Sequence, residues 1–372
     1  MSISRKAFDC LSHDLLLTKL EKLGFQGTTQ KWIASYLKNR SQMVEVSRKV
    51  EGVITTARSD ILPVTRGVPQ GSVLGPILFV LYINDLPNSL NEYCNTIMYA
   101  DDLVLMATNK SQEKLEVNAF IAVNVAADYC KSSDLIFNAT KTKQISFGRD
   151  KTKISDLPDL QSVSSINHLG VVIDDSLSWN DHIDALCKKL SSAIYAIRRT
   201  KAVSTNDACL TAYHALFETH VRYGIAVWGG TSEKNIGRIL ILQKRALRTI
   251  GGLHQRESCR NVFKEWNILT VVSIYILECI YSAIDKLCPR HQDVHEHNTR
   301  KANSFTLPTH HLKIFETKPT YAGAKFFNIL PEDLKNVHST KLKKHLKTWF
   351  IARPFYKAEE FLNWKSFLDI NI

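Results

Sequence analysis

Two adjacent acidic residues, Asp101 and Asp102, interrupt an otherwise apolar segment, IMYADDLVLM, at residues 97–106. An unpaired carboxylate is costly to bury, and two neighbouring carboxylates repel each other. Divalent cations would balance both charges, because Mg²⁺ binds oxygen ligands and commonly uses one or two carboxylates together with the phosphates of a substrate. Two such ions can activate an attacking hydroxyl and stabilise a leaving oxygen in phosphoryl transfer. The alternative is an Asx turn, in which the aspartates cap their own backbone.

A glycine-rich stretch, TRGVPQGSVLGP at residues 65–76, lies upstream of the acidic pair and leads into an apolar segment with helical spacing. Glycine lets the backbone approach a ligand closely, and a helix N-terminus favours phosphate. A structural turn that leads into a helix has the same composition. Together with the acidic pair that follows it, the stretch favours a phosphate-bearing ligand.

The elements that would position these residues follow from the spacing of apolar and β-branched side chains. Apolar residues at helical spacing predict helices at residues 13–25, 29–40, 72–90 and 111–133. β-Branched runs predict a hairpin at 43–67 and a strand, a turn and a strand at both 95–107 and 135–148. A short strand and a turn are expected at 165–179, followed by helices at 182–201, 207–221 and 238–250.

Charge favours a polyanionic partner, because the 372 residues carry a net charge of +12. Residues 301–372 contribute 12 Lys and Arg against 6 Asp and Glu. The helix expected at 238–250 interleaves basic and apolar residues, which fits either phosphate binding or a solvated helix face. The longest apolar stretch, 269–284, contains Glu278 and falls short of the roughly 20 residues of a membrane span. No membrane partner is therefore expected.

With both segments in view, the sequence resembles the reverse transcriptases of non-LTR (LINE-type) retrotransposons. YADD at 99–102 resembles their catalytic box, and GVPQGSVLGPILFVLYINDLP at 67–87 resembles the segment that contacts the incoming nucleotide and the template. KAFDCLSHDLLLTKL at 6–20 resembles the end of their first catalytic motif. NATKTKQISFG at 138–148 and HLGVVID at 168–174 resemble a later palm motif and the primer-grip region.

The resemblance implies a role for each matching residue. Asp101 and Asp102 would be catalytic and would bind the metals, which are two Mg²⁺ ions in the intact family, with Mn²⁺ as an alternative. Phe8 would lie under the sugar of the incoming nucleotide. The other residues implied in nucleotide binding are Gln70, Gly71 and Tyr99. Lys141 would protonate the leaving pyrophosphate, with Lys143 as the alternative for that role.

Three of these residues also have a purely structural interpretation. Phe8 could be an ordinary core residue, Gln70 a turn residue, and Lys141 a solvated charge on a hairpin. The motif context favours function for Phe8 and Gln70 and leaves both interpretations of Lys141 open.

The resemblance implies an α+β fold. Residues 1–180 would form a polymerase palm-like antiparallel sheet with packed helices, without the fingers. Residues 181–288 would form a mainly helical thumb-like or connecting region, and residues 289–372 a basic C-terminal region.

The implied activity is RNA-directed DNA polymerisation. Deoxynucleotides would be added to a primer 3′-hydroxyl by two-metal phosphoryl transfer. The partners are an RNA template, a DNA primer and deoxynucleoside triphosphates, with no protein partner inferred and nuclear action implied by family analogy alone. One alternative is a non-catalytic nucleic-acid-binding remnant of such an element. A weaker one is a fragment that does not fold stably.

The sequence departs from the family at the first catalytic motif, where a third metal-binding carboxylate is expected five residues before the aromatic residue. Counting back from Phe8 leads to Ile3, and a shift of one residue leads to Ser2. The departure suggests a chain that begins inside the domain. Because two carboxylates would bind two cations weakly, we expect this polypeptide alone to be a poor or inactive polymerase.

Overall fold

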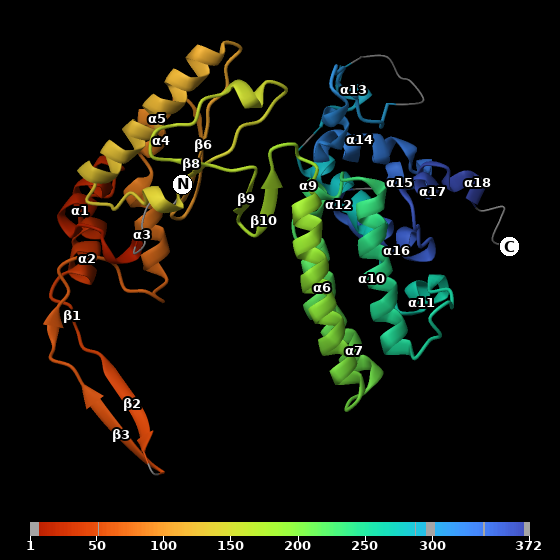
Figure 1. Cartoon of the computed structure of the whole chain (residues 1–372), viewed down its shortest axis with the longest axis horizontal. Helices are drawn as coiled ribbons and strands as arrows, with labels where there is room; N and C mark the ends of the chain where they lie inside the picture. The colour runs from red at the N-terminus through yellow and green to blue at the C-terminus, as the bar shows by residue number, and fades with distance from the viewer. Residues whose placement is uncertain (1–6, 51, 287, 295–301, 338, 368–372) are drawn as a thin grey trace. The chain divides into compact units, whose positions relative to one another are not determined.

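The computed structural model describes residues 7–50, 52–286, 288–294, 302–337 and 339–367. The chain divides into two compact units, Met1–Ser164 and Ser165–Ile372, and the elements of each are labelled in Figure 1. Neither this division nor any other observation tests the expected palm, thumb and C-terminal regions, which stay predictions.

The first unit combines helices with short paired strands. Its helices are α1 (His13–Lys22), α2 (Thr28–Leu37), α3 (Leu74–Ile83), α4 (Leu86–Leu90) and α5 (Gln112–Ser132), with the 3₁₀ helices η1 (Ala7–Asp9), η2 (Ala139–Lys141) and η3 (Lys151–Lys153). Its strands are β1 (Ser41–Gln42), β2 (Glu45–Val50), β3 (Val53–Arg58), β4 (Leu62–Pro63), β5 (Asn95–Tyr99), β6 (Asp102–Met106), β7 (Lys143–Gln144) and β8 (Gln161–Ser162).

The helices of the first unit form where a cap and an apolar face coincide. The Ser12 hydroxyl accepts a hydrogen bond from the Leu15 amide at the start of α1, as an N-cap residue does. Behind the cap, Leu16 and Leu20 are one turn apart and fully buried. These leucines belong to one core with Leu78 and Phe79 of α3.

A largely buried lysine joins three parts of this core. The Lys19 ammonium on α1 donates hydrogen bonds to the Tyr82 carbonyl oxygen and to Asp85 Oδ1, both at 2.9 Å, and to the Tyr129 hydroxyl of α5 at 2.8 Å. Burial alone would raise the pKa of Asp85, but hydrogen bonds from Tyr129 and Lys19 outweigh it and lower that pKa. The network therefore holds α1, the end of α3 and α5 together.

The strands of the described residues pair two by two. β1–β4, β2–β3, β5–β6 and β9–β10 are antiparallel, whereas β7–β8 is parallel. Figure 1 shows β2–β3 as an arm that projects from the α1–α2 end of the first unit. The α+β class expected from the sequence is confirmed.

The strand, turn and strand expected at 135–148 are wrong. The segment instead forms η2 and the two-residue strand β7. The cause is local hydrogen bonding by Asn138, whose side-chain oxygen accepts from the Lys141 amide and from the Thr140 hydroxyl, while its carbonyl oxygen accepts from the Thr142 hydroxyl. Such side-chain bonds compete with strand pairing.

The second unit is mainly helical after the β9 (Ser165–His168) and β10 (Val171–Asp174) hairpin. Its larger helices are α6 (Asn180–Lys201), α10 (Glu233–Gly251), α12 (Val271–Asp285), α14 (Pro319–Ile329) and α16 (Ser339–Ala352). Its shorter ones are α7 (Asn206–Ala212), the π-helix η4 (Tyr213–Glu218), α8 (Thr219–Arg222), α9 (Ile225–Trp228), α11 (Arg260–Glu265), α13 (His291–Val294), η5 (Lys313–Thr317), α15 (Glu332–Lys335), α17 (Ala358–Leu362) and α18 (Trp364–Phe367).

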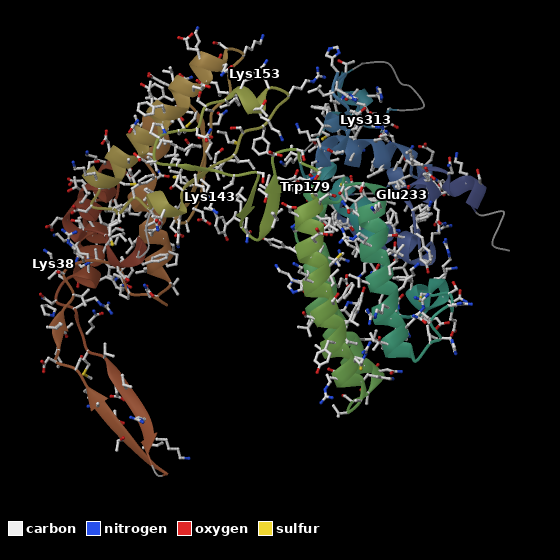
Figure 2. All side chains as sticks on the ribbon, viewed as in Figure 1. Lys38, Lys143, Lys153, Trp179, Glu233 and Lys313 are labelled. Atoms are coloured by element: carbon white, nitrogen blue, oxygen red, sulfur yellow. The ribbon has the colours of Figure 1, made fainter. Side chains whose placement is uncertain are left out.

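A nearly buried carboxylate links the hairpin of the second unit to α6. Asp174 accepts hydrogen bonds from the backbone amides of Ser176, Ser178 and Trp179. These bonds, together with one from the Ser176 hydroxyl, outweigh the effect of burial and lower the pKa of Asp174. Trp179, labelled in Figure 2 at the start of α6, is itself buried in the core of this unit.

Within the described residues, no helix is both long and apolar enough to cross a membrane.

Candidate active site

The acidic pair lies at the tip of the β5–β6 hairpin. Tyr99 pairs with Asp102 in the antiparallel register, so Ala100 and Asp101 form a two-residue turn. Ala100 has a φ of 50°, in the left-handed region that costs a residue with a Cβ about 1–2 kcal/mol. Strain of this kind is concentrated at functional sites, where the surrounding structure enforces it.

The two strands hold the pair at the surface without burying it. Leu103 is 1% exposed and packs in the core of the unit, whereas Tyr99 is 65% exposed and both aspartates are half-buried. Within the described part of the chain, no hydrogen bond reaches either carboxylate. The structure therefore does not form the Asx turn, and four carboxylate oxygens remain for other ligands.

The glycine-rich loop is held against the segment that contains Phe8. The Gly67 amide donates to the Leu11 carbonyl oxygen and the Val68 amide to the Phe8 carbonyl oxygen, both at 2.8 Å. The His13 ring nitrogen Nε2 lies 2.7 Å from the Gly67 carbonyl oxygen. Gly67 has a φ of 81°, and a Cβ built there would lie 2.8 Å from Asp9 Cα. Only glycine allows this close approach without strain.

These contacts form a small cavity of about 320 Å³. Its lining residues are Phe8, Pro69, Gln70, Gly71 and Pro76. The Phe8 ring also packs on Phe79 of α3, with 5.2 Å between ring centroids. Gln70 Nε2 donates a hydrogen bond to Asp9 Oδ1 at 3.0 Å. The structure thus brings together three of the predicted nucleotide-binding residues.

The other predicted residues belong to the same unit but do not line this cavity. Tyr99, Asp101 and Asp102 are on the β5–β6 hairpin, and Lys141 is exposed at the end of η2. Lys143, labelled in Figure 2, is exposed on β7. The functional roles of all these residues stay predictions.

The positions at which the family has a third carboxylate are occupied here by Ser2 or Ile3, and both lie outside the described residues. Elsewhere in the described chain, no three His, Cys, Asp or Glu side chains are grouped as metal ligands. The expectation that this polypeptide polymerises poorly therefore stays a prediction. The acidic pair alone fits a metal that is shared with substrate phosphates, because Mg²⁺ commonly has one or two carboxylate ligands in such sites.

Sequence reasoning missed the two side chains that hold the loop. Asp9 lies at the end of the 3₁₀ helix η1, and its carboxylate reaches Gln70. His13 opens α1 and contacts Gly67, which is 54 residues away in the sequence. A contact so distant in sequence leaves no local signal in residue spacing.

Comparison with known proteins finds a matching family and several similar proteins. Residues 4–173 match the family described as reverse transcriptase (RNA-dependent DNA polymerase). The probable RNA-directed DNA polymerase from transposon BS of Drosophila melanogaster is 29% identical over 262 residues, which cover 66% of this chain and 28% of that protein. The RNA-directed DNA polymerase from mobile element jockey of the same species is 25% identical over 265 residues, covering 67% of this chain and 28% of that protein.

A third relative, the probable RNA-directed DNA polymerase from transposon X-element of Drosophila melanogaster, is 24% identical over 283 residues, covering 71% of this chain and 30% of that protein. The chain therefore spans less than a third of the length of these relatives. Members of the matched family are nucleotidyltransferases that generally need a divalent metal, a nucleic-acid template and primer, and nucleotides.

Proposed function

We propose, because this chain belongs to the reverse transcriptase family of non-LTR retrotransposons, that Asp101 and Asp102 bind Mg²⁺ against the phosphates of a deoxynucleoside triphosphate. The nucleotide would be added to the 3′-hydroxyl of a DNA primer on an RNA template. The observation that carries the proposal is the pair of half-buried carboxylates, free of hydrogen bonds from the described residues, on a strained turn.

The cavity beside the glycine-rich loop supports a nucleotide as the ligand. Phe8 offers an aromatic surface for a sugar, and its packing on Phe79 fixes the ring. Gln70 adds a polar side chain, and Gly71 has a φ of 81° with nothing within 4 Å of a built Cβ. The loop can therefore present its backbone to a ligand without obstruction.

The residues of this chain would divide the work of nucleotide addition. Asp101 and Asp102 hold the metal, while Phe8, Gln70 and Gly71 orient the nucleotide, with Tyr99 beside the acidic pair. The metal, when bound, supplies Lewis-acid stabilisation of phosphate charge and activates the attacking hydroxyl. Lys141, or Lys143 in its place, donates a proton to the pyrophosphate leaving group.

The rival function is nucleic-acid binding without catalysis, through the basic side chains of α10. Two of these side chains already have partners within the chain. Arg238 lies 2.6 Å from an Asp184 oxygen, and the Arg248 guanidinium donates to the Glu257 carbonyl oxygen at 2.7 Å. Lys244 lies over the Tyr356 ring at 4.8 Å. These contacts leave α10 with fewer free cations for phosphates than its sequence suggests.

Titration calorimetry of the purified chain with a deoxynucleoside triphosphate, with and without Mg²⁺, tests the proposal. We expect Mg²⁺-dependent binding that weakens at least about tenfold in Asp101→Asn and in Asp102→Asn. Asp128→Asn is the matched control, because Asp128 is an exposed aspartate on α5 of the same unit. The affinity for RNA, measured in parallel, should be unchanged in all three variants.

Two results would contradict the proposal. One is nucleotide binding that ignores both Mg²⁺ and the two aspartates. The other is RNA binding that falls with salt as expected for a Lys and Arg surface, with no nucleotide binding at all. The second result would favour the non-catalytic remnant.

A further inference from the structure

Asp9 contacts the cavity residue Gln70 but is not one of the predicted site residues. Its Oδ1 accepts a hydrogen bond from Gln70 Nε2 at 3.0 Å, across 61 residues of sequence. Both side chains are exposed, so this bond alone would be weak. Whether it can fix the amide depends on how firmly the two backbones are held.

The backbones of the two segments are tied together on both sides of this bond. Gly67 packs against Asp9 itself, and a Cβ at Gly67 would lie 2.9 Å from the Asp9 carbonyl oxygen. The Val68 amide donates to the Phe8 carbonyl oxygen one residue before Asp9. Ser72 continues the loop rigidly, because its hydroxyl donates to the Pro69 carbonyl oxygen and accepts from the Gly75 amide. These backbone contacts therefore hold Asp9 and Gln70 facing each other.

The chemistry of the two groups determines which end of the amide faces Asp9. An ionised carboxylate only accepts hydrogen bonds, whereas the Gln amide has a donating NH₂ end and an accepting oxygen. The NH₂ group must therefore face Asp9, and the Gln70 oxygen is directed to the other side. Because Gln70 lines the cavity, a ligand there meets an amide in one fixed orientation.

We propose that Asp9 is a positioning residue that fixes the Gln70 amide, so that its oxygen accepts a hydrogen bond from a sugar hydroxyl of the bound nucleotide. This inference rests on the proposed function, because it assumes that the cavity takes a nucleotide. A site built to bond a hydroxyl discriminates against an analogue that lacks it. Asp9 thereby sets the preference for deoxynucleotides over dideoxynucleotides.

The Asp9→Asn variant tests the inference, because an Asn side chain both donates and accepts and so releases the Gln70 amide to either orientation. The wild-type chain should bind a deoxynucleoside triphosphate with Mg²⁺ more tightly than the dideoxy analogue. We expect Asp9→Asn to reduce this preference about three- to tenfold, through weaker deoxynucleotide binding. Asp14→Asn, which changes an exposed aspartate of α1 in the same segment, should leave the preference unchanged.

A second measurement needs no nucleotide. In chains labelled with ¹⁵N-glutamine, the two Gln70 amide protons should resonate apart from those of exposed glutamines, and Asp9→Asn should move them toward the common position. A Gln70→Leu variant assigns the signal. Unfolding by heat should be the same in Asp9→Asn and Asp14→Asn, which separates positioning from stability.

The outcomes are distinguishable from failure of the proposed function. A wild-type chain that prefers the deoxynucleotide, with the same preference in Asp9→Asn, overturns the inference and leaves the proposed function standing. Unchanged Gln70 amide signals in Asp9→Asn also overturn it. A wild-type chain that binds no nucleotide overturns both, whereas a loss of preference confined to Asp9→Asn and Gln70→Leu supports the inference.

Discussion

The two units hold glutamine side chains in opposite environments, Gln243 in the second unit and Gln70 in the first. Gln243 in the second unit is fully buried, donates to the Tyr213 hydroxyl and to the Leu269 carbonyl oxygen, and accepts from the Val271 amide. Gln70 in the first unit is exposed and, among the residues that the structure describes, its side chain bonds only to Asp9. A saturated buried amide stabilises a fold, whereas an amide with a free oxygen beside a cavity can bind a ligand.

The same contrast extends to the cores. In the second unit one core runs through α6, α10, α12 and α14 and fully buries large side chains such as Trp228 and Phe217. The core of the first unit is smaller, with 18 buried apolar residues among those described, against 45 in the second unit. The candidate site is therefore carried by the unit with less burial, and backbone hydrogen bonds rather than a deep core position its residues.

The largest expected effect is on the packing of the second unit. A Cβ at Gly323 of α14 would lie 1.9 Å from the Cys279 carbonyl oxygen of α12, so Gly323→Ala should destabilise this unit by about 3 kcal/mol through overpacking. Urea unfolding followed by tryptophan fluorescence measures it, because five of the six tryptophans lie in this unit. Gly237→Ala in α10 is the control, since nothing lies within 4 Å of its Cβ, and it should stabilise the helix by about 0.5–1 kcal/mol. Equal effects of the two variants would show that α12 and α14 are not in close contact.

In the first unit, the corresponding test is a substitution of Gly67, the glycine that contacts Asp9. Gly67→Ala should cost about 2–3 kcal/mol, because it adds both a clash with the backbone of Phe8 and Asp9 and the strain of a left-handed alanine. Gly71→Ala has the same φ of 81° without the clash and should cost only about 1 kcal/mol. Hydrogen exchange of peptides from the first unit measures both. A similar loss of protection in both variants would contradict the close approach at Gly67.

The units should also differ in their response to mild acid. Burial lowers the pKa of His182 in the second unit, and the nearby charge of Lys189 lowers it further. The folded state therefore prefers neutral His182. Its contribution to stability is complete above the unfolded pKa of about 6.5 and is lost as the pH falls through the lower folded value.

Unfolding of the second unit by urea at several pH values measures this effect. The free energy of unfolding should fall below about pH 6.5, with a slope from this group of at most about 1.4 kcal/mol per pH unit. The His182→Gln variant should show a smaller slope in that range. The same slope in His182→Gln would assign the pH dependence to other groups.

The smallest expected effect is at the acidic turn. Ala100→Gly removes the left-handed strain of about 1 kcal/mol but adds a comparable backbone entropy to the unfolded chain, so stability should change by less than about 0.5 kcal/mol. Ala100→Val should instead weaken the turn, because a β-branched residue rarely adopts a positive φ. Hydrogen exchange of residues 95–106 compares the two. Equal protection in Ala100→Gly and Ala100→Val would show that residue 100 is not left-handed.

Several helices, among them α1, α2, α5, α6 and α10, could be predicted from the sequence because each has a local cause. The stripe of leucines after Ser12 predicted α1, and β-branched flanks around Asp101 predicted the β5–β6 hairpin. The segment at 135–148 was mispredicted because the side-chain bonds of Asn138 override its β-branched composition. The pairing of Asp9 with Gln70 depends on backbone contacts between residues far apart in the sequence, which periodicity does not report.

The central claim is that the acidic pair and the Phe8–Gln70 cavity serve one nucleotide. Iron-mediated cleavage tests it directly, because Fe²⁺ substituted for Mg²⁺ generates hydroxyl radicals that cut the backbone close to the metal. With a deoxynucleoside triphosphate bound, we expect mass spectrometry to find cuts at residues 99–102 and also near residues 8 and 70, all absent in Asp101→Asn and Asp102→Asn. Cuts confined to 99–102, or cuts that persist in both variants, would contradict the claim.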